Sequence, residues 1–275
     1  MELFDGKLEA KKLDLFISEK VRELSTLGKL AIIQIGTDEV SKKYVDLKLK
    51  VCVSLGITAE YIFIRESLAD EEINNRIREI LSRSEVTGAI IQLPLPRKSL
   101  KSVLNLLPAD KDVDVLSSTN QFQYYSNELN FAPPVVRALK YFLDINDIEV
   151  HNKDVCIVGN GFLVGRPLEH FLTVSRAKVS VIANYVSGNA LNYQLIILSA
   201  GIPKLVSGLD IAKNAVVIDF GSSILDGKVT GDLDIKSDLS HLSIVSPSPG
   251  GMGPLVVRFL ILNHMKVYEI ERSIV

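Results

Sequence analysis

Residues 154–171 read DVCIVGNGFLVGRPLEHF, a short apolar run followed by a glycine-rich loop and the start of a helix. Gly159 would permit the tight turn after the predicted strand, and Gly161 would let the backbone approach a pyrophosphate. Gly165 would allow close packing of the helix, whose N-terminus adds unpaired N–H groups and a positive dipole. The G-x-G-x-x-x-G spacing is one residue longer than the common form, and glycines also close ordinary turns between strands and helices. The strand, loop and helix context nevertheless favours a dinucleotide site.

The candidate cofactor-binding residues are Gly159, Asn160, Gly161, Val164 and Gly165 of this segment, and Asn184 beyond it. Asn184 stands at the end of the next predicted strand, where NAD sites often carry an acidic residue and NADP sites a basic one. Asparagine is neither, so the residues themselves leave the choice between NAD and NADP open.

Strand-like runs alternate with helical patterns on both sides of this loop, as in KLAIIQI (29–35), EEINNRIREIL (71–81), GAIIQL (88–93), QLIILSA (194–200) and AVVIDF (215–220). Such alternation predicts an α/β fold of two βα domains whose sheets are largely parallel and covered on both faces. A segment with two prolines, residues 130–147, is expected to lead into a linking helix. We therefore expect a catalytic domain over 1–133, a dinucleotide-binding domain over 134–254 and a C-terminal helix over 255–275 that packs on the first domain.

Composition excludes several classes of protein. The chain has 275 residues, 47% of them apolar and 23% charged, with a net charge of -2, so a nucleic-acid partner is not expected. No apolar run reaches the roughly 20 residues that span a bilayer, and the N-terminus lacks a signal-peptide pattern, which favours a cytoplasmic protein without a membrane partner. Cys52 and Cys156 are expected to be buried thiols, and no metal site is expected, because neither the cysteines nor the histidines have ligand spacing.

A second constellation precedes the glycine loop by more than a hundred residues. Ser41, Tyr44 and Lys48 are spaced i, i+3 and i+7, so a helix would place a hydroxyl, a phenol and an amine on one face. The plainer interpretation is an amphipathic helix with Tyr44 buried and the lysines solvated, and spacing alone favours it. The other motifs of the chain must decide between the two.

Three further motifs contain candidate ligand-binding residues. Gln92 ends an apolar strand before two prolines, and a buried glutamine needs hydrogen-bond partners. Asp112 and Asp114 lie in the loop sequence KDVD, whose spacing fits both an acidic turn cap and a functional carboxylate. An aspartate could pair through both oxygens with an amino-pyrimidinone ring. In the loop SPSPGGMGP (246–254), the prolines stiffen the backbone and the glycines let it come close to a ligand, as a ligand-binding loop requires.

Together, VSKKYVDLK, GAIIQLPLP, KDVD, the glycine loop with VGRP, and PSPGGMGP resemble, in order and separation, the motifs of the methylenetetrahydrofolate dehydrogenase/cyclohydrolase family. The resemblance covers nearly the whole chain. It implies a bifunctional enzyme with a catalytic domain, a Rossmann-type domain, a cleft between them, and usually a homodimer. Its reactions would be oxidation of 5,10-methylenetetrahydrofolate with NAD(P)⁺ and hydrolysis of the methenyl product to 10-formyltetrahydrofolate, with tetrahydrofolate derivatives as ligands.

The resemblance also implies roles for individual residues. Lys48 would be the principal catalytic residue, with Tyr44 and Gln92 supporting it, and Asp114 would hold the pterin ring. The implied substrate-binding residues are Ser41, Tyr44, Asp114, Pro249, Gly250 and Gly251.

The chain departs from the family pattern at four places. Val115 replaces the glycine after K-D-V-D, and Pro133-Pro134 stands for a longer P-C-T-P loop. Asn160 and Gly161 replace an Arg-Ser pair whose arginine would contact the 2′-phosphate of NADP, and Asn184 stands near the usual serine. NADP is therefore expected as the family default, with NAD or dual use open.

The sequence leaves three alternatives to this bifunctional enzyme open. One is another two-domain dehydrogenase, acting on shikimate-like hydroxy acids, and another is a dehydrogenase-only enzyme of this fold. The third is a non-catalytic folate- or dinucleotide-binding protein.

Overall fold

The computed structural model describes residues 1–24 and 27–268. Contacts within the chain divide it into two compact units. One unit contains Met1–Lys11 and Val135–Val256, and we call it the nucleotide unit. The other contains Lys12–Pro134 and continues from Val257, and we call it the catalytic unit. Each unit has its own parallel sheet.

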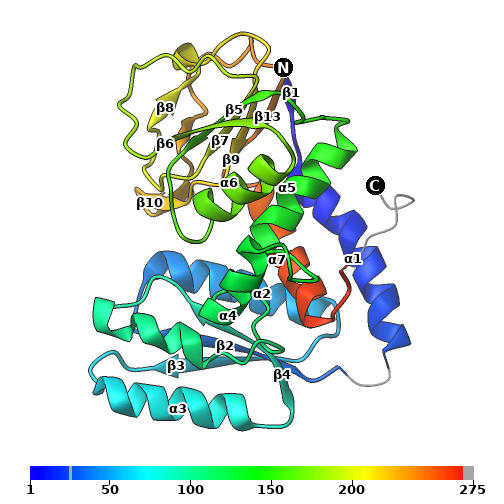
Figure 1. Cartoon of the computed structure of the whole chain (residues 1–275), viewed down its shortest axis with the longest axis vertical. Coiled ribbons are helices and arrows are strands. Elements are labelled where there is room, and N and C mark those ends of the chain that lie inside the picture. Colours follow the sequence, from blue (N-terminus) through cyan, green and yellow to red (C-terminus); the bar gives the residue numbers. More distant parts are fainter. Residues whose placement is uncertain (25–26, 269–275) are drawn as a thin grey trace. The chain divides into compact units, whose positions relative to one another are not determined.

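The catalytic unit is built on a three-stranded parallel sheet in the order β3-β2-β4. Its strands are β2 (Lys29–Ile35), β3 (Ala59–Ile64) and β4 (Val86–Gln92), and its main helices are α2 (Glu39–Ser54) and α3 (Asp70–Ser82). The chain crosses from β2 to the neighbouring β3 and then back past β2 to β4. These opposite crossovers place α2 and α3 on opposite faces of the sheet (Figure 1).

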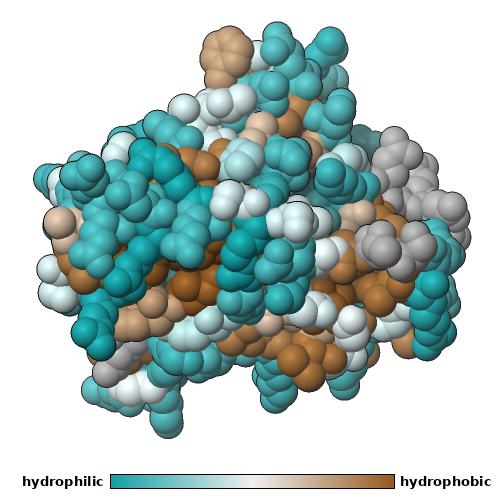
Figure 2. All heavy atoms as spheres, turned by 90° about the horizontal axis from the view of Figure 1, so that it is seen from below, coloured by the Kyte–Doolittle hydropathy of each residue, from teal (hydrophilic) through white to brown (hydrophobic). Residues whose placement is uncertain are grey.

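Helix α3 is amphipathic, which fixes the face that it turns to the sheet. Its buried side chains are Ile73, Ile77, Ile80 and Leu81, the spacing of one helical face. The space-filling view from the side of α3 shows hydrophilic residues over much of the surface (Figure 2). The helix η1 (Lys98–Leu106) and α4 (Ser118–Tyr125) complete this unit before the linking helix.

The nucleotide unit contains a six-stranded, fully parallel sheet in the order β1-β13-β9-β7-β5-β6. Its strands are β1 (Glu2–Leu3), β5 (Asp154–Val158), β6 (Lys178–Ile182), β7 (Leu195–Leu198), β9 (Val216–Asp219) and β13 (Ile244–Ser246). After β6 the chain returns past β5 to form β7, so the strand order reverses between β5 and β7. Ligands of open parallel sheets bind at this switch point, outside the carboxyl ends of the strands.

The remaining elements of the nucleotide unit lie around this sheet. They are α5 (Pro134–Ile145), α6 (Gly165–Val174), η2 (Gly208–Asp210), the parallel pair β8 (Val206–Ser207) and β12 (Leu233–Asp234), and the hairpin of β10 (Ser223–Leu225) and β11 (Lys228–Thr230). One apolar cluster of this unit joins buried side chains of β5, β7, β9 and β13 with others from β8 and β12.

The predicted α/β class is confirmed, but the ends of the chain differ from the expected boundaries. Strand β1 pairs with β13 of the nucleotide unit, so residues 1–11 do not group with the expected 1–133 domain. Helix α1 (Gly6–Glu23) begins in the nucleotide unit and continues into the catalytic unit.

The C-terminal helix is shorter than the expected 255–275. Helix α7 is Met252–His264, and Lys266 then adopts a left-handed backbone with a φ of 57°. The amide of Val267 donates to the carbonyl oxygen of Leu262, as in the turns that end helices. Residues 257–268 group with the catalytic unit, and 269–275 lie outside the described residues.

Two further sequence predictions concern single residues and helices. Cys52 and Cys156 are both buried free thiols, as predicted. Within the described residues, no helix combines the length and the apolar character needed to cross a membrane.

Candidate active site and cofactor site

Helix α2 is the element that carries Ser41, Tyr44 and Lys48. It begins after Asp38, whose side chain accepts a hydrogen bond from the amide of Ser41 at 2.7 Å and so caps the first turn. The Ser41 hydroxyl donates to the carbonyl oxygen of Leu93, 2.9 Å away, just beyond β4. A buried serine therefore ties the start of α2 to the end of β4.

Lys48 forms the second link between α2 and β4. Its Nζ donates to Oε1 of Gln92 at 2.7 Å, and Nε2 of Gln92 donates to the carbonyl oxygen of Leu93 at 2.9 Å. Lys48 is only 8% exposed, and Tyr44, one turn earlier, is partly buried. The surface-helix interpretation, which required solvated lysines, is therefore wrong for Lys48, although Lys42 is exposed.

Burial shifts the pKa values of Lys48 and Asp114 away from their ordinary values. Desolvation lowers the pKa of the Lys48 amine, while the negative charge of Asp114 acts in the opposite direction. Desolvation raises the pKa of Asp114 to about 6, against the lowering influence of Lys48. The two groups are thus electrostatically coupled, and each holds the other nearer its charged form. Such a coupled pair is a recognised mark of a functional site.

Asp112 and Asp114 have different roles although they are two residues apart. Asp112 is buried and accepts hydrogen bonds from the amides of Leu116 and Ser117, both at 2.9 Å, and from the Ser117 hydroxyl at 2.7 Å. The acidic turn cap weighed for this loop is therefore correct for Asp112. Asp114 is instead coupled to Lys48.

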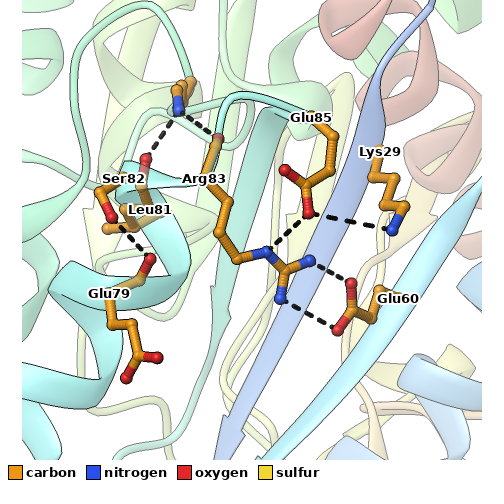
Figure 3. Close-up of polar contacts among 8 residues, drawn as sticks. Lys29, Glu60, Glu79, Leu81, Ser82, Arg83 and Glu85 are labelled. Atoms are coloured by element: carbon orange, nitrogen blue, oxygen red, sulfur yellow. Dashed lines mark hydrogen bonds and ion pairs between the residues drawn. The ribbon is translucent and has the colours of Figure 1, made fainter.

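Lys111 anchors the start of the same loop to helix α3. Its Nζ donates to the carbonyl oxygens of Leu81 at 2.7 Å and Arg83 at 3.3 Å. Arg83 in turn pairs with Glu60 and Glu85 (Figure 3), so the end of α3 is itself fixed. A cation at a helix C-terminus also opposes the negative end of the helix dipole.

Asn263 of α7 holds the loop from another side and was not predicted. Its Nδ2 donates to the carbonyl oxygens of Val113 at 3.0 Å and Ala132 at 3.1 Å. Asn263 is 150 positions from Val113 in sequence, and no spacing pattern connects them. Sequence reasoning therefore had no signal that could have found it.

Val115 has a backbone conformation that β-branched residues rarely adopt. Its φ is 57° and its side chain is fully buried. This left-handed conformation costs an L-residue about 1–2 kcal/mol, and glycine escapes that cost. A glycine, which the family pattern has at this position, would adopt this backbone without the strain that the valine bears.

We expect the free energy of unfolding of Val115→Gly to equal that of Val115→Ala or to exceed it by up to about 1 kcal/mol. Both variants lose buried methyl groups, but only glycine removes the left-handed strain. Equilibrium unfolding in urea measures the difference. Val113, buried in the same loop without a positive φ, is the matched control, and there alanine should be the more stable by about 0.5–1 kcal/mol. The same order at both positions would contradict the strain at Val115.

The glycine loop lies at the switch point of the nucleotide unit. Gly159 has a φ of 100°, and a Cβ there would lie 2.6 Å from the carbonyl carbon of Ser199, which follows β7. A Cβ on Gly165 would lie 2.5 Å from the carbonyl oxygen of Gly159, so close helix packing occurs as predicted. The loops after β5 and β7 therefore touch, and only glycine fits between them.

The loop also meets the requirements of a pyrophosphate site. A Cβ on Gly161 would have no atom within 4 Å, so open space lies beside the backbone there. Helix α6 begins after Val164 without a side-chain cap, and the positive end of its dipole favours an anion. The expected unpaired amides are fewer than a helix start usually offers, because the Arg166 amide donates to the carbonyl oxygen of Gly161 at 3.1 Å and Pro167 has no N–H. Asn160 is exposed. These residues fit a dinucleotide.

Asn184 is exposed just beyond the carboxyl end of β6. Arg176 and Lys178 lie at the opposite, amino end of that strand, since Lys178 pairs with Asp154 and Ile182 with Val158. Five strand residues span roughly 13–17 Å. Of Arg166, Arg176 and Lys178, only Arg166, in the first turn of α6, is at the correct end for a 2′-phosphate.

The residues Pro249, Gly250 and Gly251 form the loop between β13 and α7. Pro249 is exposed, Gly250 has a φ of 108°, and a Cβ on Gly251 would lie 2.2 Å from Oγ of the buried Ser246. The loop belongs to the nucleotide unit, whereas Ser41, Tyr44, Lys48, Gln92 and Asp114 belong to the catalytic unit. Of the predicted residues, the structure joins Ser41, Lys48 and Gln92 around the end of β4 and couples Asp114 to Lys48.

A buried lysine beside a strand-end glutamine, together with a switch-point glycine loop, defines a two-domain α/β enzyme with an NAD(P)-binding domain. Residues 4–114 match the catalytic domain of tetrahydrofolate dehydrogenase/cyclohydrolase, and residues 133–272 match its NAD(P)-binding domain. The chain belongs to the tetrahydrofolate dehydrogenase/cyclohydrolase family.

Known proteins resemble the chain over nearly its full length. It is 33% identical to the bifunctional protein FolD of Hydrogenobaculum sp., covering 98% of this chain and 99% of that protein. It is 34% identical to that of Aquifex aeolicus, covering 97% and 95%. The crystal structure of the bifunctional enzyme FolD from Campylobacter jejuni superposes with a TM-score of 0.86 at 29% identity, covering 98% of both chains.

Proposed function

We propose that this chain oxidises 5,10-methylenetetrahydrofolate to 5,10-methenyltetrahydrofolate with a nicotinamide cofactor and hydrolyses the product to 10-formyltetrahydrofolate. The observation that carries the proposal is the buried Lys48 amine, hydrogen-bonded to Gln92 and coupled to Asp114. A lysine held in this way can exchange a proton near neutral pH. Family membership supplies the substrate.

In the oxidation, the bridging carbon of the substrate loses a hydride, which the nicotinamide ring accepts when the cofactor is bound. The contribution of the chain is to orient the reactants. We assign pyrophosphate binding to Gly159, Asn160, Gly161, Val164 and Gly165, and ribose binding to Asn184. The open space beside Gly161 and the positive end of the α6 dipole would receive the phosphates.

In the hydrolysis, water attacks the cationic methenyl carbon, and a proton must then move to the nitrogen that leaves that carbon as the ring opens. We assign this proton transfer to Lys48. Its lowered pKa gives a larger neutral fraction, able to accept a proton from the attacking water and return it to the nitrogen. Gln92 directs the amine through the 2.7 Å hydrogen bond, and we assign a similar supporting role to Tyr44.

For the pterin ring we propose Asp114 as the binding carboxylate. With a pKa of about 6, it is mostly ionised at pH 7 and can accept two adjacent N–H groups. Further substrate contacts are assigned to Ser41, Tyr44 and the loop residues Pro249, Gly250 and Gly251. These assignments rest on the family resemblance of the motifs and on the described geometry of each unit.

For the cofactor we propose NADP, with NAD as a second acceptor. No carboxylate stands at position 184 to repel a 2′-phosphate, and Arg166 is a cation at the correct end of β6. The replacement of the family's arginine by Asn160 is the reason that NAD remains in the proposal.

We expect purified protein mixed with methylenetetrahydrofolate and either cofactor to yield reduced cofactor and then 10-formyltetrahydrofolate. Reduced cofactor is measured by its absorbance, and the methenyl and formyl products are measured separately with NAD and with NADP. Product from NAD alone would contradict the NADP assignment. Oxidation without hydrolysis would indicate a dehydrogenase-only enzyme, and no turnover with either cofactor would indicate a binding protein. Sedimentation of the same preparation tests the proposed homodimer, which a mass of one chain would exclude.

A further inference from the structure

Two buried carboxylates of the nucleotide unit are not used by the mechanism above. Asp219 ends β9 and Asp232 precedes β12, and they are 1% and 0% exposed. Neither forms an ion pair with a described residue; backbone amides surround both instead. Asp219 accepts hydrogen bonds from the amides of Gly221 at 2.7 Å, Asp232 at 3.2 Å and Leu233 at 2.9 Å.

Asp232 holds the loop that follows β7. Its Oδ2 accepts from the amides of Ala200 at 2.6 Å and Gly201 at 3.1 Å, and its Oδ1 accepts from Ile202 at 2.8 Å. Three consecutive amides therefore converge on one carboxylate. Hydrogen bonds to an ionised acceptor are about twice as strong as neutral ones, so this loop is firmly held.

The loop held by Asp232 forms one side of the switch point. It begins next to Ser199, whose carbonyl carbon would lie 2.6 Å from a Cβ on Gly159, and the Ser199 hydroxyl donates to the carbonyl oxygen of Val158 at 3.2 Å. The position of residues 200–202 relative to the glycine loop is thus set from both ends. A cofactor bound at the switch point would lie against this loop.

The same carboxylates connect to the loop between β13 and α7. The amide of Gly231 donates to the carbonyl oxygen of Ser248 at 3.1 Å. A Cβ on Gly231 would lie 2.1 Å from Oδ2 of Asp219 and 2.8 Å from Cβ of Ser248, so only glycine fits there. Residues 231–232 therefore join the loops that follow β7, β9 and β13.

Keeping these carboxylates costs stability. Desolvation raises the pKa of Asp219 to about 7, with backbone amides opposing the shift and Asp232 adding to it, and burial also raises the pKa of Asp232. A carboxyl with a raised folded-state pKa contributes stability at acid pH that is lost as the pH rises through that pKa. Proteins accept such a cost where the group serves a site.

We propose that Asp232 is a positioning residue for the dehydrogenase reaction, which fixes residues 200–202 so that the nicotinamide cofactor is held in one geometry. Asp219 supports it by fixing the backbone at 232 and 233. The inference rests on the proposed function and deepens it. A change at Asp232 should therefore impair the dehydrogenase reaction and spare the hydrolysis, because Asp232 positions a cofactor loop and touches none of the described residues around Lys48.

The test is Asp232→Asn, which keeps the shape but replaces one acceptor oxygen by an N–H donor that faces other donors. We expect the KM for the cofactor to rise or the dehydrogenase kcat to fall, by about 10- to 100-fold. Hydrolysis of methenyltetrahydrofolate supplied directly should stay within about twofold. Amide hydrogen exchange at residues 200–202 should accelerate. The control is Asp238→Asn, since Asp238 is exposed and accepts from the amide of its near neighbour Ser240 at 2.9 Å.

A second variant covers the case in which Asp232→Asn fails to fold. Ser223→Ala removes a hydrogen bond of 2.6 Å from the Ser223 hydroxyl to the carbonyl oxygen of Gly201, and should raise the cofactor KM about 2- to 10-fold. Unchanged dehydrogenase kinetics in the folded variants, or an equal loss of both activities, would overturn the positioning role. Wild-type protein that oxidises no methylenetetrahydrofolate would instead overturn the proposed function.

Discussion

Lys48→Met is expected to lose cyclohydrolase activity by roughly 10²–10⁴-fold, the range over which a positioned acid or base acts. Methionine fills a similar volume but cannot move a proton. The loss should appear in kcat for methenyltetrahydrofolate hydrolysis, followed by the decay of its absorbance. The dissociation constant of the cofactor, measured by fluorescence titration, should not change, because the glycine loop belongs to the other unit.

The same variant should fold normally. The folded-state pKa of Lys48 is lowered, so its ionised form costs stability below the ordinary lysine pKa, and an apolar replacement removes that cost. A melting temperature at pH 7 equal to or above that of the wild type is therefore expected. Lys50→Met is the matched control, since Lys50 lies on the same helix and is exposed, and it should retain full hydrolysis. Normal hydrolysis by Lys48→Met would refute the assignment.

The structure explains why the Lys48 face could be predicted from the sequence. The helical period puts Ser41, Tyr44 and Lys48 on one side of α2, and a strand-end glutamine in a βα fold lies at the same edge of the sheet as the helix start. The first relation follows from the helical period and the second from the common direction of parallel strands, so both can be predicted without the tertiary structure. The Ser41 to Leu93 and Lys48 to Gln92 hydrogen bonds are their outcome.

Other features depend on contacts that no local pattern encodes. Strand β1 has two residues and pairs with β13, more than 240 positions away, and such a short strand gives no period to read. Asn263 reaches Val113 across 150 positions. The hairpin of β10 and β11 did carry a signal, because Asp226-Gly227 between short strands is a favoured hairpin turn, but the preceding run is only three residues long.

The KDVD loop lies between these cases. The sequence could indicate an acidic loop, but which carboxylate faces a ligand depends on where the backbone amides point. The amides of Leu116 and Ser117 meet Asp112, and that closure, together with the left-handed backbone of Val115, leaves Asp114 to interact with Lys48. Only the folded turn distinguishes the two aspartates.

Asp114→Ala is expected to weaken folate binding by about 10- to 150-fold, because hydrogen bonds to a charged group contribute roughly 1.5–3 kcal/mol. Isothermal titration with a tetrahydrofolate derivative measures the change. Because the pKa of Asp114 is about 6, wild-type affinity should also fall as the pH drops through 6, whereas the variant should lose that dependence. An unchanged folate dissociation constant would refute the role.

The melting temperature of Asp114→Ala shows whether a loss of folate binding comes from the missing carboxylate or from unfolding. The folded-state pKa of Asp114 is raised, so its contribution to stability is present at acid pH and lost as the pH rises through about 6. Removing the carboxyl should leave the melting temperature at pH 8 unchanged or higher. The charge of Asp114 also raises the pKa of Lys48, so the hydrolysis profile of the variant should shift to lower pH. Asp110→Ala, an exposed aspartate four residues earlier, should change neither folate affinity nor this profile.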